Sequence, residues 1–173
     1  MLNSFLKQSI NLNQDIKNRL VVLLDNNNQN FSTEINAYLP TNTYSLPIQD
    51  MIPFLTIQDN LLLGIKKKNS ETVLYFIRKY SQKFKLPSSI LTEFAKDVSK
   101  NQQMVLQIMR AIALKQSILI NQLANYVVSN KFIEDLLPVL HYFVAKEQTT
   151  ILIVTSSKEL LQSPYYDQCI FLS

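Results

Sequence analysis

The chain of 173 residues is 47% hydrophobic and 17% charged, which suits one domain with its own core and excludes a disordered chain. Its net charge of +4 would suit an acidic partner, but Lys66, Lys67 and Lys68 form its one dense basic run, so nucleic-acid binding is not expected. A single cysteine, Cys169, excludes a disulfide framework and a cysteine-based metal site.

Three further features of the composition narrow the functional class. No apolar run approaches ~20 residues, and residues 1–17 lack the apolar core of a signal peptide, so a cytoplasmic location is expected. The one histidine, His141, has helical spacing and is interpreted as a packed helical residue. Average usage of about 7% predicts about twelve glycines, yet Gly64 stands alone. Loops that wrap a phosphate with backbone N–H groups need glycine, so such a loop is not expected.

The first predicted elements are those of an α/β sheet. Residues 19–24 form a continuous Val- and Leu-rich run, which indicates a strand buried on both faces. The Asn-rich stretch 25–30 predicts a turn, and 31–39 predicts a short helix. Residues 43–48 are interpreted as an edge strand broken by Pro47.

The middle of the chain changes to a helical pattern. Residues 56–65, 70–84 and 88–98 carry apolar side chains at three- and four-residue spacing, which predicts an insert of two or three helices. The polar stretches 66–70 and 85–89 are expected to separate them. A longer amphipathic helix is predicted next.

That helix covers residues 101–115, and strands and helices alternate from there to the end of the chain. The strands are predicted at 117–120, 149–155 and 167–173, and the helices at 130–146 and 157–163. This alternation predicts an α/β fold with a mainly parallel sheet flanked by helices. The expected division is a core of residues 1–50 and 101–173 with a helical subdomain of residues 51–100, in one compact domain.

From about residue 19 onward, the order and spacing of these segments resemble an ATP-binding cassette (ABC) transporter ATPase. Residues 55–64, LTIQDNLLLG, are similar to the segment that follows the family's glutamine loop, often LTVRENLLLG. Residues 98–124 resemble the run from the LSGGQ signature to the second phosphate-site strand, and 149–161 resemble the strand that ends in Thr-His-Asp. The resemblance implies a P-loop NTPase fold with a RecA-like core.

Two of these blocks carry positions with known roles in the family. Gln49 falls on the glutamine that contacts the metal and the attacking water. Ser99 and Gln102 match signature positions, whereas Lys100 and Asn101 stand where its two glycines belong. For Gln49, Ser99 and Gln102, retention as remnants of the fold is as good an interpretation as retained function. The family's first strands and its adenine-stacking aromatic residue are expected to be largely missing.

The resemblance places substitutions at the catalytic positions. Asn121 falls on the Asp that helps to hold magnesium, and Gln122 falls on the catalytic Glu. Thr155 is kept in the third block, but Ser156 stands in place of the switch histidine. Arg110 matches the arginine of the helix after the signature.

The phosphate loop is matched in outline only, over residues 25–33. Asn30 replaces a glycine, as Asp25 does, Phe31 replaces the lysine, and Ser32 and Thr33 persist. Phosphoryl transfer depends on positioning and on neutralising the charge of the phosphates, which a phenyl ring cannot do. Taken with the resemblance, these substitutions imply a pseudo-ATPase without ATP, magnesium or any other metal as a cofactor.

The same resemblance implies how such a protein would act. It could pair with an active cassette ATPase or with its own copy, or dock on a membrane permease through a groove formed by Gln49, Met51, Ile52 and Phe54. Those apolar residues are alternatively interpreted as core. Two other functions stay open: a slow or atypical ATPase subunit, and a free-standing adaptor or immunity-type protein.

Overall fold

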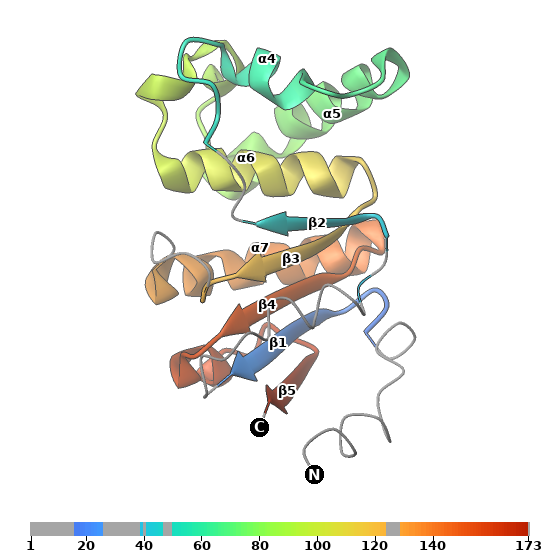
Figure 1. Ribbon diagram of the computed structural model, residues 1–173, viewed down its shortest axis with the longest axis vertical. Coiled ribbons are helices and arrows are strands. Elements are labelled where there is room, and N and C mark those ends of the chain that lie inside the picture. The colour runs from blue at the N-terminus through green and yellow to red at the C-terminus, as the bar shows by residue number, and fades with distance from the viewer. Residues whose placement is uncertain (1–15, 26–38, 40, 47–49, 124–128, 173) are drawn as a thin grey trace.

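Figure 1 shows the computed structural model, which describes residues 16–25, 39, 41–46, 50–123 and 129–172. Within this part of the chain, five strands form one sheet in the order β2-β3-β4-β1-β5, and every neighbouring pair is parallel. The strands are β1 Leu20–Asp25, β2 Thr43–Leu46, β3 Ser117–Asn121, β4 Ile151–Thr155 and β5 Gln168–Leu172. The predicted fold class is confirmed, and β2 lies at an edge of the sheet as expected.

The central strands are buried because both of their faces are apolar. On β3 and β4, Ile118 and Ile151 point into the main core together with helices α6 Lys100–Ala113 and α7 Asn130–Glu147. Their neighbours Leu119 and Leu152 join a second cluster on the other face of the sheet. Each such side chain contributes about 1.5–3 kcal/mol on burial, which favours a strand over a solvated loop.

The helical insert lies beyond α6, away from the sheet (Figure 1). It contains α4 Ile57–Leu62 and α5 Lys67–Tyr80, followed by the 3₁₀ helices η1 Ser81–Phe84, η2 Ile90–Thr92 and η3 Ala95–Asp97. Two predictions were wrong here. The polar stretch 66–70 was expected to separate two helices, but most of it forms the first turn of α5.

The second error is the helix predicted at 88–98, which is two 3₁₀ turns joined by extended backbone. Phe94 pairs with Thr56 in an antiparallel bridge, and the Ala95 N–H donates to the Leu55 carbonyl at 3.0 Å. The Gln103 amide donates to the Ala95 carbonyl at 2.8 Å. These long-range hydrogen bonds use backbone groups that a continuous helix would need for itself.

Elsewhere the element types follow the prediction more closely. The segment predicted as a helix at 157–163 is the 3₁₀ helix η4 Lys158–Gln162. The predicted helix 31–39 lies outside the described residues apart from Leu39, as does most of the turn 25–30. In the part of the chain that the structure describes, no helix is both long and apolar enough to cross a bilayer.

Candidate functional site

The carboxyl ends of the central strands form the candidate site. Leu24 of β1 is level with Thr155 of β4, and Asn121 of β3 is level with Val154. Asp25, Asn121 and Thr155 are the last residues of β1, β3 and β4. Because these strands are parallel, the three residues lie along the same edge of the sheet, the one formed by the carboxyl ends of the strands. Parallel α/β sheets bind their ligands at this edge, so it is the first place to look for chemistry.

The two amides at the end of β3 hold the backbone that leaves the strand. Asn121 and Gln122 are 7% and 8% exposed. The Asn121 Oδ1 accepts a hydrogen bond from the Leu123 N–H at 3.0 Å, which forms an Asx turn. The Gln122 N–H donates to the Val154 carbonyl at 3.0 Å, and its Nε2 donates to the Asn130 Oδ1 at 3.4 Å. This arrangement links the end of β3 to β4 and to the first turn of α7.

The end of β4 is built in a similar way. Thr155 is buried, and its Oγ1 accepts a hydrogen bond from the Ser157 N–H at 3.0 Å. Ser157 in turn caps η4 by accepting from the Glu159 N–H at 3.3 Å. Ser156, which the sequence resemblance assigns to the switch position, is exposed. The retained threonine therefore has a local structural role in turning the chain.

At the described part of this edge, the end of β3 offers no carboxylate for a magnesium ion. Magnesium in phosphate sites is held by one or two carboxylates together with the phosphates. β3 ends here in two neutral amides, and no group of three or more His, Cys, Asp or Glu residues among the described residues could hold a metal ion. Asp25, a carboxyl side chain in place of the small or basic residues that suit a phosphate, is buried at the end of β1. Gln49 and the loop residues Asn30, Phe31, Ser32 and Thr33 lie outside the described residues.

The signature block begins helix α6 with a capping box. The Ser99 Oγ accepts from the Gln102 N–H at 3.3 Å, and the Gln102 Oε1 accepts from the Ser99 N–H at 3.2 Å. Each residue satisfies a backbone N–H that the helix leaves unpaired. Lys100 forms an ion pair with Asp50, and Asn101 lines a shallow pocket with Gln102. Helix capping alone accounts for a serine and a glutamine at this spacing.

We expect Ser99→Ala to lower the free energy of unfolding by about 1 kcal/mol, because the cap of α6 is lost. Urea denaturation of the variant would measure this loss. The control is Ser88→Ala, an exposed serine in a loop, which should change stability by less than about 0.5 kcal/mol. If Ser99→Ala is as stable as the parent chain, the capping role assigned to Ser99 is incorrect.

Arg110 links the helical insert to the sheet through hydrogen bonds and a cation–π contact. From α6 it donates through Nε to the Leu61 carbonyl and through a terminal nitrogen to the Leu63 carbonyl, each at 2.9 Å. Its guanidinium also lies 5.8 Å from the centre of the Tyr44 ring on β2. The arginine thus satisfies carbonyls at the end of α4, where Gly64 follows with a left-handed φ of +70°.

Among the described residues of the predicted docking groove, Phe54 is the strongly exposed one. Met51 packs in the main core, so it does not offer the surface that was expected of it. The Asn60 side chain holds the backbone of Ile52 through hydrogen bonds of 2.7 and 3.0 Å. Phe54 is 73% exposed, and the ring of Phe94 on the adjoining segment is also exposed. What remains is a loop that exposes Phe54, on backbone that is hydrogen-bonded to Asn60 and to the segment that carries Phe94.

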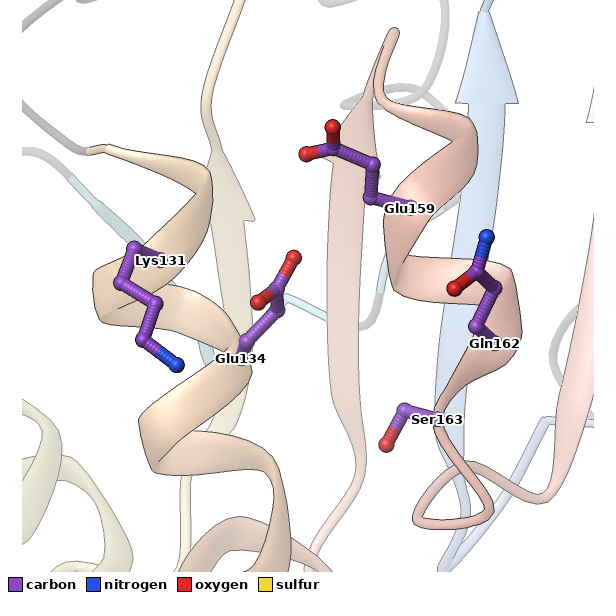
Figure 2. A pocket seen from close by; sticks show the side chains of 5 residues that line it. All are labelled: Lys131, Glu134, Glu159, Gln162 and Ser163. Atoms are coloured by element: carbon purple, nitrogen blue, oxygen red, sulfur yellow. The ribbon is translucent and has the colours of Figure 1, made fainter.

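A further hollow, which sequence reasoning missed, lies between α7 and η4. Its volume is about 600 Å³. Lys131 and Glu134 line it from α7, and Glu159, Gln162 and Ser163 line it from the opposite side. Figure 2 shows Glu134 and Glu159 pointing into the gap from opposite walls. Two carboxylates facing each other would disfavour an anionic ligand such as a nucleotide. Their positions, 25 residues apart in helical segments, carried no motif that could have revealed the hollow.

Comparison with known proteins places the fold. No family model and no curated protein sequence matches the chain. A dimeric bacterial ABC transporter cassette matches over 90% of this chain and 82% of its own, with a TM-score of 0.61 and 16% identity. A metal-chelate type ABC transporter in an inward-facing conformation matches over 90% and 69%, with a TM-score of 0.68 and 13% identity. An ATP-binding cassette in its ADP conformation matches over 90% and 77%, with a TM-score of 0.66 and 15% identity. The fold is therefore that of the ATP-binding cassettes of ABC transporters.

Proposed function

We propose that this chain is a catalytically inactive counterpart of an ABC-transporter ATP-binding subunit and acts through protein contacts in the cytoplasm. In this proposal it pairs with an active cassette ATPase or docks on a membrane permease, and it uses neither ATP nor magnesium. Residues 51–100 would serve as the helical subdomain and the rest as the core. Neither kind of contact would require catalysis by this chain.

The observation that carries this proposal is the end of β3. A cassette ATPase needs a carboxylate for its metal and a base for its water at this point. This chain has Asn121 and Gln122 instead, both buried and both bonded to the surrounding backbone or to α7. A neutral amide can hold a water molecule but cannot accept its proton. The hydrogen bonds of both side chains support a structural role in place of the catalytic one.

The contact surface that supports a permease partner is the loop before α4. Phe54 is an exposed apolar side chain on backbone that Asn60 holds in place. An aromatic side chain on a rigid loop is typical of an anchor that enters a pocket on a partner. Phe94, a second exposed aromatic residue, lies on the segment whose backbone pairs with this loop.

Two measurements test the proposal. Mg-ATP at millimolar concentration should leave the melting temperature of the full chain unchanged, because a ligand that does not bind the folded state cannot stabilise it. Affinity purification from the native cell should recover a permease subunit or a cassette ATPase identified by mass spectrometry. Phe54→Ala should weaken recovery of a permease, whereas Phe171→Ala, a similarly exposed phenylalanine on β5, should not.

A rise in melting temperature with Mg-ATP that Ser32→Ala or Gln49→Ala abolishes would favour the slow-ATPase alternative and overturn the proposal. The adaptor alternative would be favoured if affinity purification recovers neither a permease subunit nor a cassette ATPase and the gene lies apart from any permease gene.

A further inference from the structure

Three lysines and three tyrosines come together where the end of α5 meets the second half of α7. We call this set the lysine–tyrosine patch; its members are Lys79, Lys83, Lys146, Tyr75, Tyr80 and Tyr142. Lys79 belongs to α5, Lys83 to η1 and Lys146 to α7, so folding brings the charges together from distant parts of the chain.

Each ammonium group of the patch lies against tyrosine rings. The Lys146 Nζ donates to the Tyr142 hydroxyl at 2.9 Å and lies 4.9 Å from the centre of the Tyr80 ring. The Lys83 Nζ lies 3.9 Å from the centre of the Tyr142 ring. The Lys79 Nζ is 5.2 Å from the Tyr75 ring. These cation–π contacts restrict long side chains that would otherwise sample many rotamers.

Among the described residues, no carboxylate forms an ion pair with a lysine of the patch. The ion pairs among the described residues engage Lys100, Lys115 and Lys131, a further contact joins His141 to Asp167, and none of these includes a lysine of the patch. Lysine side chains are charged at neutral pH at their ordinary pKa, and the hydrogen bond to Tyr142 raises the pKa of Lys146 further. Ammonium groups gathered in this way attract an anion to their surface.

We propose that the lysine–tyrosine patch binds an acidic segment of a partner protein. Carboxylates on separate side chains can reach the three ammonium groups individually, and such charge complementarity favours association. A single-stranded nucleic acid fits less well because its bases stack on free aromatic faces, and lysines already occupy faces of Tyr80 and Tyr142. An anionic membrane is typically bound by about four to eight basic residues, more than the patch supplies. This inference does not depend on the function proposed above.

The chain offers a matched control in Lys66, Lys67 and Lys68. These three lysines are consecutive and exposed, and no cation–π contact or ion pair of the described residues involves them. Changing either set of three to glutamine lowers the net charge equally. The comparison therefore separates an assembled site from general attraction to a basic protein.

The experiment measures fluorescence anisotropy of a fluorescein-labelled oligoglutamate peptide titrated with the full chain. We expect Lys79→Gln/Lys83→Gln/Lys146→Gln to weaken binding about tenfold, because three exposed ion pairs are lost. Lys66→Gln/Lys67→Gln/Lys68→Gln should weaken it by less than about threefold. Replacing the patch lysines with arginine, which keeps charge and ring contact, should preserve binding. Circular dichroism and melting temperature confirm that each variant is folded.

Equal losses in the two glutamine variants, or no binding by the parent chain, would overturn the proposal. So would an oligothymidylate of the same charge that binds more tightly than the peptide and loses its binding in the patch variant. Patch-dependent sedimentation with phosphatidylcholine–phosphatidylserine vesicles, without patch-dependent peptide binding, would identify a membrane surface instead and equally exclude the acidic protein segment.

Discussion

Asn121→Asp/Gln122→Glu should lower the free energy of unfolding by about 2–5 kcal/mol at neutral pH and should not produce ATPase activity. Both positions are less than a tenth exposed, so each new carboxylate would lose most of its hydration. At position 122, a carboxylate would also replace the amide that donates to the Asn130 Oδ1. Two oxygen acceptors, the new carboxylate and the Asn130 Oδ1, would then face each other without a hydrogen between them.

The destabilisation should depend on pH with a predictable sign. Burial raises the pKa of an introduced carboxyl group above its value of about 4 in the unfolded chain. Below that pH the group is protonated in both states, and the penalty is absent. As pH rises towards the folded-state pKa, the unfolded state releases its proton first, so the penalty grows. Urea denaturation of the variant and the parent chain at pH 4 and pH 7.5 would measure the difference.

The control for this prediction is Asn101→Asp/Gln82→Glu, which adds the same charge at exposed positions. It should change stability by less than about 1 kcal/mol at either pH. Two outcomes would show that the amides do not replace lost carboxylates in the way proposed. One is a double variant at positions 121 and 122 that is as stable as this control. The other is the appearance of magnesium-dependent ATP hydrolysis.

The sequence was sufficient for the sheet because its strands are short apolar runs with little alternative. Residues 117–120 and 149–155 are too short and too continuously apolar for amphipathic helices, and they form β3 and β4. The alternation with helices then favoured parallel pairing. The ends of elements shifted by a residue or two, as with Asn121, which belongs to β3 although its side chain already begins the turn.

What the sequence could not provide were features that depend on distant partners. The periodicity at 88–98 is that of a helix, but the extended pairing of Phe94 with Thr56 replaces it. Met51 looks like a surface residue beside Phe54, yet only the fold places one inside and the other outside. The lysine–tyrosine patch is likewise invisible in the sequence, because its lysines are drawn from α5, η1 and α7.

The other large effect that we expect is at Phe143, whose replacement by alanine should cost about 3–5 kcal/mol of unfolding free energy. Phe143 is fully buried in α7 and stacks on Phe84 of η1 at 5.3 Å between ring centres. The rings of Phe76 and Tyr80 from α5 also lie against it, at 5.4 and 5.0 Å. Its removal would leave a cavity between the helical insert and the helix that covers the sheet.

Phe54→Ala removes the same atoms from an exposed site and should change stability by less than about 0.5 kcal/mol. The comparison distinguishes the cost of opening a buried cavity from the cost of removing a phenyl ring. Urea denaturation gives both values. Phe143→Leu should recover part of the stability, since it refills part of the cavity.

The Phe143 ring also packs against Tyr80 and Tyr142 of the lysine–tyrosine patch. Phe143→Ala should therefore weaken oligoglutamate binding as well, at a temperature where the variant is still folded. A variant that lost less than about 1 kcal/mol would show that the insert does not depend on this cluster for its attachment to α7.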